Sequence, residues 1–270
     1  MFLGLAVDSG RSEEECDRIS GEPSNESDVI SPFDGCAPQE IDPGRTDPVA
    51  GPSPNCAMIV ARSCWLEIPE ADYVGHMSSP AVGQRPVLGR LLGEVLKAVR
   101  PAAVLFLGGS TGNGLEYVNP DVTARVVVID INPKYLLRLR ERFPRSVYEL
   151  DMRCGDVAEV DLEREADDLV HAGLILEYVA WPVLLPRIAS SLRPGGVFSV
   201  ILQMPSASSA AVTPTGFTRL RALAPLFRFV EPTALIDAAR DHGLRLNARH
   251  TESLPSGKSF AVLRFEKSAV

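Results

Sequence analysis

The sequence predicts an α/β protein with a doubly wound, mostly parallel sheet of seven strands that closes with an antiparallel C-terminal hairpin. Two short apolar runs, residues 102–109 and 124–132, are typical of strands covered on both faces. Helical segments separate the strand-like runs, and strands joined through helices run parallel with right-handed crossovers. The last two runs, residues 243–254 and 259–267, are joined by only four residues, so they must pair as an antiparallel hairpin.

The remaining elements follow from local signals along the chain. Apolar residues at helical spacing predict a helix within residues 83–101 that stops at Pro101. Asn132 and Pro133 are a good N-cap and first-turn pair, and they predict a second helix over residues 133–143. The other predicted elements are a weaker third strand in residues 146–157, a fourth strand in 167–176, a helix in 182–193 that Pro194, Gly195 and Gly196 stop, and a fifth strand in 197–203.

The N-terminal stretch, residues 1–57, has a different composition. It holds seven prolines, six glycines and seven serines, with twelve acidic and only three basic residues. Such a composition cannot bury enough apolar surface to offset the entropy of ordering. We therefore expect residues 1–57 to be a disordered extension and residues 71–270 to form the domain. Met58 lies where the composition changes, and this makes it a candidate start of the natural protein.

Charge and cysteine usage narrow the possible functions. The net charge of −8 is concentrated in residues 1–57, and the rest of the chain sums to about zero. A nearly neutral domain lacks the one-sided basic surface that nucleic-acid binding requires. The five cysteines form no Cys-x-x-Cys pair, and so neither a disulfide framework nor a metal site is expected. No run approaches the roughly 20 apolar residues of a membrane helix. We expect a cytoplasmic protein with no nucleic-acid or membrane partner.

A glycine-rich turn follows the first predicted strand, at the carboxyl edge where open α/β sheets hold ligands. Its spacing does not match the dinucleotide fingerprint, and the Gly-Lys-Ser/Thr of a phosphate-binding loop is absent. Because no cation stands in this turn, it suits an uncharged or zwitterionic ligand that backbone groups approach closely. The candidate binding residues in the turn are Gly108, Gly109, Ser110, Gly112 and Asn113.

Two acids follow the next two strands. Asp130 ends the second strand, where a carboxylate can accept hydrogen bonds from both hydroxyls of a ribose, and Ile131 beside it is a further candidate. Asp156 follows the third strand, where it can receive an adenine amino group while Val157 flanks the ring. Each acid also has a simpler explanation, Asp130 as a favourable charge at a helix N-terminus and Asp156 as an ordinary turn acid. The adjacent glycine turn favours ribose binding by Asp130.

This combination resembles the class I S-adenosylmethionine-dependent methyltransferases. The matching features are the glycine turn, the acids after strands two and three, "DDLVHAGLILEYV" and the "LRPGG" before strand five. The resemblance covers roughly residues 73–270 and extends to a bacterial subgroup of small methyltransferases. It implies a Rossmann-like methyltransferase fold, S-adenosylmethionine as cofactor, and methyl transfer to an acceptor. We expect a small-molecule acceptor, because the added segments are short and no basic groove is present.

The chain departs from the family pattern at two positions. Phe106 stands where members commonly carry an acid, which removes a carboxylate that would help to orient the methionine amino group. Ser110 stands where members commonly carry glycine. A serine is small enough to fit in the turn if its φ is negative.

His171 and Glu177, at the end of the fourth strand, are the candidate catalytic residues. His171 has the right chemistry for a base near neutral pH, and it is equally well explained as a hydrogen-bonded strand residue. Glu177 suits a base or a contact to a cationic acceptor, and it is also explained as a helix-start carboxylate. The resemblance implies that the segment 73–77 closes over the cofactor as a lid, and it is equally well explained as an amphipathic segment that packs on the sheet edge. The segment 204–229, with a Ser and Thr cluster followed by an apolar helix, is expected to be a flexible flap that covers the acceptor.

Two other functions stay open. A non-catalytic protein that binds an adenosyl ligand in the same fold is compatible with the loss of the acid at Phe106. An NAD(P)-dependent oxidoreductase is disfavoured by the glycine spacing and by the closing hairpin.

Overall fold

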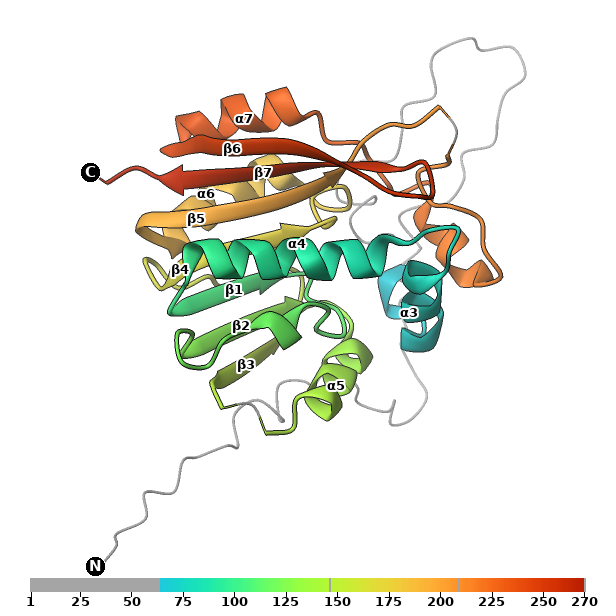
Figure 1. The fold of residues 1–270 in the computed structure, drawn as a ribbon, viewed down its shortest axis with the longest axis horizontal. Coiled ribbons are helices and arrows are strands. Elements are labelled where there is room, and N and C mark those ends of the chain that lie inside the picture. The colour runs from blue at the N-terminus through green and yellow to red at the C-terminus, as the bar shows by residue number, and fades with distance from the viewer. Residues whose placement is uncertain (1–63, 146, 208, 270) are drawn as a thin grey trace, which may run out of the picture.

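The structure is a computed structural model that describes residues 64–145, 147–207 and 209–269. The predicted extension at 1–57 and the candidate start at Met58 lie outside these residues. The described chain forms one seven-stranded sheet in the order β3-β2-β1-β4-β5-β7-β6, which confirms the predicted fold class (Figure 1). The strands are β1 (Ala103–Leu107), β2 (Arg125–Asp130), β3 (Glu149–Cys154), β4 (Asp167–Gly173), β5 (Leu192–Gln203), β6 (Leu244–Ser253) and β7 (Ser259–Lys267).

Strand pairing has the predicted directions. Strands β1 to β5 pair in parallel, and β7 pairs antiparallel with both β5 and β6. The chain moves outward from β1 to β2 and β3, and then returns to add β4 on the other side of β1. This reversal between β1 and β4 is the point of an open α/β sheet where ligands bind.

Helices cover both faces of the sheet. The described helices are α3 (Glu70–Ser78), α4 (Gln84–Val99), α5 (Pro133–Arg142), α6 (Trp181–Ser191) and α7 (Pro232–Asp241), with the 3₁₀ helices η1 (Leu115–Tyr117) and η2 (Thr218–Leu223). Helices α4 and α5 pack their apolar side chains on one face, and α6 and α7 pack theirs on the other. Strands β1, β2 and β4 contribute side chains to the hydrophobic cores on both faces of the sheet. This explains the apolar runs in these strands.

The predicted helices are α4, α5 and α6, and all three are present. Helix α7 was not predicted, although Pro232 in its first turn is the same signal as Pro133 in α5. The apolar helix expected within the flap is the short 3₁₀ helix η2.

Helix α3 and the segment around η2 lie together at one end of the sheet (Figure 1). A Cβ added at Gly75 of α3 would lie 2.3 Å from Cζ of Phe217, so the helix and the flap approach closely at this point. Ile68, before α3 and before the predicted domain boundary at residue 71, is 1% exposed and packs with Leu220 and Leu223.

Asn132 fastens the segment before α3 to the end of β2. Its Oδ1 accepts a hydrogen bond from the Lys134 amide (3.0 Å), which caps α5 as predicted. Its Nδ2 donates to the carbonyl of Trp65 (2.9 Å) and, at 3.4 Å, to that of Ile68. One side chain therefore caps a helix and holds the covering segment.

The replacement Asn132→Ser separates these two roles. Serine retains an N-cap oxygen but lacks the amide donor, so we expect a loss of about 1 kcal/mol of stability. Backbone amides of residues 64–69 should exchange hydrogen faster. The matched control is Asn119→Ser, because the side chain of Asn119 also accepts a backbone N–H, from Asp121 at 3.0 Å, on the exposed surface. Unchanged exchange in residues 64–69 would show that Asn132 does not hold this segment.

Candidate functional site

The glycine turn after β1 folds back onto the end of β2. The amides of Gly108 and Gly109 both donate to the carbonyl of Ile129, at 2.9 and 3.2 Å. Gly108 has φ +66°, and a Cβ at Gly109 would lie only 2.3 Å from Cγ1 of Val128. These two positions require glycine, one for its backbone conformation and the other for its close approach to β2.

Ser110 does not have the negative φ that would make it a simple substitute for glycine. Its φ is +49°, in the left-handed region, where an L side chain is strained. Its amide donates to Oδ2 of Asp130 at 2.7 Å, and this bond holds the residue in that conformation. The expected negative φ at Ser110 is therefore wrong. The turn holds Ser110 in the left-handed backbone conformation that favours glycine.

Asp130 joins the turn to the segment after β2. It is 6% exposed, and besides the Ser110 bond its Oδ1 accepts from the Asn132 amide at 2.9 Å. Burial raises the pKa of Asp130 to about 6, and the two backbone hydrogen bonds oppose this shift. A carboxylate has about four acceptor sites. Two acceptor sites of Asp130 therefore remain. Because the Asp130 side chain lines the main cavity at this edge of the sheet, these sites suit a ligand with a diol.

The main cavity has a volume of about 130 Å³ and lies at the carboxyl edge of the sheet. Six of the predicted binding residues line it, from three different strand ends. Asp156 accepts a hydrogen bond from the Ala158 amide at 2.9 Å, and Val157 is 4% exposed. The predicted residues that line it are Gly108, Ser110, Asp130, Ile131, Asp156 and Val157.

The other three turn residues, Gly109, Gly112 and Asn113, line a second, smaller cavity of about 60 Å³. Asn113 donates from Nδ2 to the carbonyl of Arg85 at 2.9 Å, so its amide points back toward the start of α4. Gly108 and Ser110 line this cavity as well as the main one, so the turn forms a shared wall between two neighbouring cavities.

The two candidate catalytic residues lie outside the lining of the main cavity. His171 is 7% exposed and lines the smaller cavity, with Nδ1 3.2 Å from Oγ of Ser199. Burial lowers its pKa to about 4, so the ring is neutral at physiological pH. Glu177 is 1% exposed, its Oε1 accepts from the Gln203 amide at 2.8 Å, and burial raises its pKa to about 7. Glu177 links the ends of β4 and β5.

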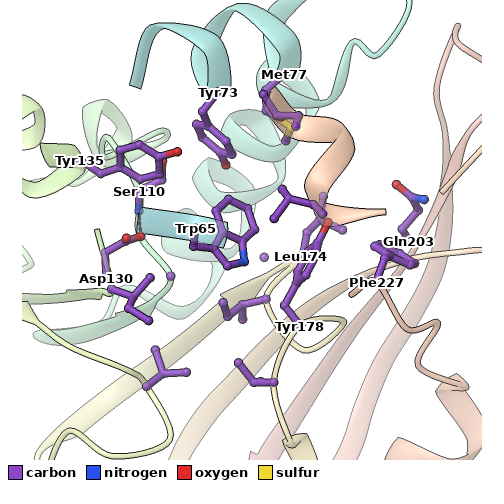
Figure 2. Close-up of a pocket in the computed structure, with 18 of the residues that line it drawn as sticks. Trp65, Tyr73, Met77, Ser110, Asp130, Tyr135, Leu174, Tyr178, Gln203 and Phe227 are labelled. Carbon is purple, nitrogen blue, oxygen red and sulfur yellow. Dashed lines mark hydrogen bonds between the residues drawn. The ribbon is translucent and has the colours of Figure 1, made fainter. Parts of the chain in front are cut away.

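Aromatic side chains cover the main cavity (Figure 2). Trp65 forms edge contacts with Tyr73 and Tyr178, with ring centroids 6.1 and 5.2 Å apart. Tyr73 in turn lies 5.3 Å from Tyr135. Burial raises the pKa of Tyr73 to about 12, against the opposing effect of the Ser110 hydroxyl near it. Trp65, which precedes the regular pattern of the sequence, had no local signal that marked it as a lining residue.

A polar group at the far side of the cavity was also missed. Gln203 ends β5, and its Oε1 accepts from Nε2 of Gln84 at 2.8 Å and from Nζ of Lys258 at 3.2 Å. Figure 2 places Gln203 and Asp130 on opposite sides of the cavity, with Trp65 and Tyr178 between them. The cavity therefore has two polar ends and an aromatic middle.

No group of three or more His, Cys, Asp or Glu side chains in residues 64–269 that the structure describes is arranged to hold a metal ion. None of the helices in the same part of the chain combines the length and the apolar composition that crossing a membrane requires.

Known proteins share this fold and this core sequence. Residues 104–196 match the family model of a methyltransferase domain. Trans-aconitate 2-methyltransferase from Methylobacterium nodulans is 36% identical over 107 residues, which are 39% of this chain and 39% of that protein. The enzyme of the same name from Methylobacterium radiotolerans is 36% identical over 109 residues. The matched segment thus spans about two-fifths of the length of these curated relatives.

Two solved structures show the same fold over most of the chain. 1,6-didemethyltoxoflavin-N1-methyltransferase from Burkholderia thailandensis has a TM-score of 0.58 and 19% identity, over 86% of this chain and 99% of its own. The N-methyltransferase NodS from Bradyrhizobium japonicum has a TM-score of 0.57 and 18% identity, over 78% of this chain and 99% of its own. Both structures contain S-adenosylhomocysteine.

Fold and cavity together define a Rossmann-like α/β protein with a cavity at the carboxyl edge of its sheet. Residues 104–196 of this fold match the methyltransferase-domain model. This match and the shared fold support the resemblance to the class I S-adenosylmethionine-dependent methyltransferases that the glycine turn and Asp130 indicated.

Proposed function

We propose that this chain transfers the methyl group of S-adenosylmethionine to a small-molecule acceptor. The observation that carries the proposal is that the glycine turn, Asp130 and Asp156, which follow three separate strands, line one cavity. The match to the methyltransferase-domain model supports the same cofactor. The names of the two curated relatives make trans-aconitate one acceptor to test.

The residues present fit this cofactor. Asp130 retains two acceptor sites for the ribose hydroxyls, and Asp156 with Val157 stands where an adenine would lie. Among the described residues that line the cavity, the acids are Asp130 and Asp156, and no further acid stands in for the one missing at Phe106, which is 4% exposed within β1. In its place Ser110 and Tyr73 bring hydroxyl groups to the cavity, and they are our candidates for the contact to the methionine part.

The chemistry asks mainly for positioning. When bound, the cofactor supplies a methyl group activated on a sulfonium, so the protein must align an acceptor and exclude water. The cluster of Trp65, Tyr73 and Tyr178 covers the cavity and serves both needs. Neither His171 nor Glu177 lines the main cavity, and His171 lines the smaller one beside it, so their role as bases stays a prediction.

Calorimetric titration tests the cofactor part of the proposal. We expect S-adenosylmethionine and S-adenosylhomocysteine to bind to the wild-type protein and NAD not to bind. Binding of NAD alone would favour the oxidoreductase. Binding of both adenosyl ligands with no methyl transfer to any component of a metabolite extract would favour the non-catalytic alternative. The exclusion of nucleic acid as a substrate and the cytoplasmic location stay predictions.

The pH dependence of binding follows from the pKa of Asp130, which burial raises from 3.8 to about 6. Between about pH 4 and 6 the folded protein binds more protons than the unfolded chain, so this group's contribution to stability falls as the pH rises through that window. Ribose binding needs the carboxylate, so cofactor affinity should rise over the upper part of the same window.

Calorimetry from pH 5 to pH 8 checks this prediction. The wild-type affinity for S-adenosylhomocysteine should increase with pH, with a midpoint near the pKa of about 6. Asp167 and Glu177 also have raised pKa values, about 6 and about 7, and contribute to stability in the same direction. The Asp130→Asn protein isolates Asp130, because it retains both of these groups and should lose the affinity step. An equal step in both proteins would contradict the assignment.

A further inference from the structure

Lys258 is a buried cation in the wall of the main cavity. It ends the turn between β6 and β7, and it is 3% exposed. Its position follows from the topology: β7 runs antiparallel to β5, so the start of β7 lies beside Gln203 at the carboxyl end of β5. The hairpin turn thus reaches the edge of the sheet where ligands bind.

Among the described residues, the hydrogen-bond partners of the Lys258 ammonium are neutral groups. Its Nζ donates to the carbonyls of Ala210 (3.0 Å) and Ala211 (2.7 Å), and more weakly to Oε1 of Gln203 at 3.2 Å. None of the ion pairs between described residues includes Lys258. Burial lowers its pKa to about 8, so the amine is still mostly charged at neutral pH. A buried charge without a counter-charge is costly to the folded protein.

The surrounding charges give this end of the cavity a positive sign. Lys258 is the only lysine or arginine among the described residues that line the cavity, and Asp130 and Asp156 are the only acids. Asp130 lies on the side opposite Gln203, which contacts Lys258 (Figure 2). His76 lines the cavity too, and burial, followed by the charge of Lys258, lowers its pKa and so favours the neutral ring.

We propose that the methyl acceptor is an organic carboxylate, bound at the Lys258 end of the cavity and methylated on a carboxylate oxygen. This inference rests on the proposed function and names its substrate class. An incoming carboxylate oxygen can replace Oε1 of Gln203, the longest of the three Lys258 contacts. Gln203 then keeps its shorter bond from Gln84. The carboxylate of the acceptor supplies the missing negative charge, and Lys258 keeps its hydrogen bonds to the carbonyls of Ala210 and Ala211.

The reaction balances without a general base. A lone pair of the carboxylate oxygen forms the new bond to the methyl carbon. The bond between that carbon and the sulfonium sulfur breaks, and its electron pair stays on sulfur as a neutral thioether. The products are a methyl ester and S-adenosylhomocysteine, and no proton moves. This agrees with the positions of His171 and Glu177 outside the lining of the main cavity.

The experiment uses S-adenosylmethionine with a labelled methyl group and a metabolite extract separated by anion exchange. One fraction is anionic, and the other contains neutral and cationic compounds. Mild base releases labelled methanol from methyl esters and leaves methyl groups on nitrogen, carbon, sulfur or ether oxygen in place. We expect label in products of the anionic fraction, and we expect mild base to release it.

Four variants test the role of Lys258. Lys258→Gln removes the charge but retains a donor for the flap carbonyls, and Lys258→Met removes both. Each should lower kcat/KM for the anionic acceptor by about tenfold or more, while Lys258→Arg retains most activity. The matched control is Lys267→Met at the other end of β7, where Nζ of Lys267 donates to the Leu192 carbonyl at 2.7 Å. All four proteins should bind S-adenosylhomocysteine as the wild type does.

The results separate the two proposals. If the wild-type protein binds neither adenosyl ligand, the proposed function itself fails. If it binds them, base-stable label or label only in the neutral and cationic fraction overturns the carboxylate assignment alone. Binding with no labelled product overturns the carboxylate assignment and the proposed methyl transfer together. Wild-type kinetics of Lys258→Gln with the anionic acceptor would overturn the assignment of Lys258.

Discussion

Replacing Asp130 with asparagine is expected to weaken the binding of S-adenosylhomocysteine by about 10- to 100-fold. A hydrogen bond to a charged acceptor contributes about 1.5–3 kcal/mol, which corresponds to this range of affinities. Asparagine has one acceptor oxygen, so it cannot serve the amides of Ser110 and Asn132 and also two ribose hydroxyls. Calorimetric titration at pH 7.5 gives the affinity directly.

The matched control is Asp168→Asn. Oδ2 of Asp168 accepts hydrogen bonds from the backbone amides of Ala102 (2.9 Å) and Ala103 (2.8 Å), so this carboxylate also binds two backbone groups. It belongs to β4 and lies beside the start of β1, at the opposite end of that strand from the glycine turn, and it does not line the main cavity. Asp168→Asn should lower stability and leave cofactor affinity unchanged. Equal affinity losses in both variants would show that Asp130 acts only through the stability of the fold.

Gly109→Ala is expected to destabilise the protein by about 1–3 kcal/mol and to impair cofactor binding as well. The new Cβ would lie 2.3 Å from Cγ1 of Val128, a side chain with no exposed surface in the centre of β2. A β-branched residue in a packed sheet has little freedom to move aside. The turn must therefore shift, and its neighbours Gly108 and Ser110 line the cavity. Urea unfolding and calorimetry measure the two effects.

Two further variants make this prediction specific. Val128→Ala removes the clashing methyl group, so Gly109→Ala should be less destabilising in that background than in the wild type, with a coupling of about 1 kcal/mol. Gly216→Ala is the control, because a Cβ at Gly216 meets nothing within 4 Å. It should change stability by less than about 0.5 kcal/mol. Additive effects of Gly109→Ala and Val128→Ala would contradict the proposed clash.

The local patterns of the sequence were sufficient for the sheet and for the cofactor end of the cavity. Apolar runs, the Asn132 and Pro133 pair and the short hairpin link are signals within a few residues of one another. The parallel topology then follows from chirality and chain connection alone. Because parallel strands end at one edge, the glycine turn and Asp130 had to come together there.

Residues that come together only through packing were harder to predict. His171 and Glu177 have the right chemistry for a base, but the side of the strand and the bonds to Ser199 and Gln203 decide what they reach. The positive φ of Ser110 depends on the bond from its amide to Asp130, twenty residues away. Neither fact has a local signature in the chain.

The sequence by itself determined the succession of the strands, the helices α4, α5 and α6, the closing hairpin, and the glycine turn with a carboxylate at the next strand end. It did so because backbone propensity, capping and connection length are local properties. Only the tertiary structure decided that Trp65 covers the cavity and that Lys258, in a polar turn that a sequence places on the surface, is buried at the acceptor end. The physical reason is that burial depends on what distant segments bring alongside, here β5 and the flap carbonyls that bind the ammonium.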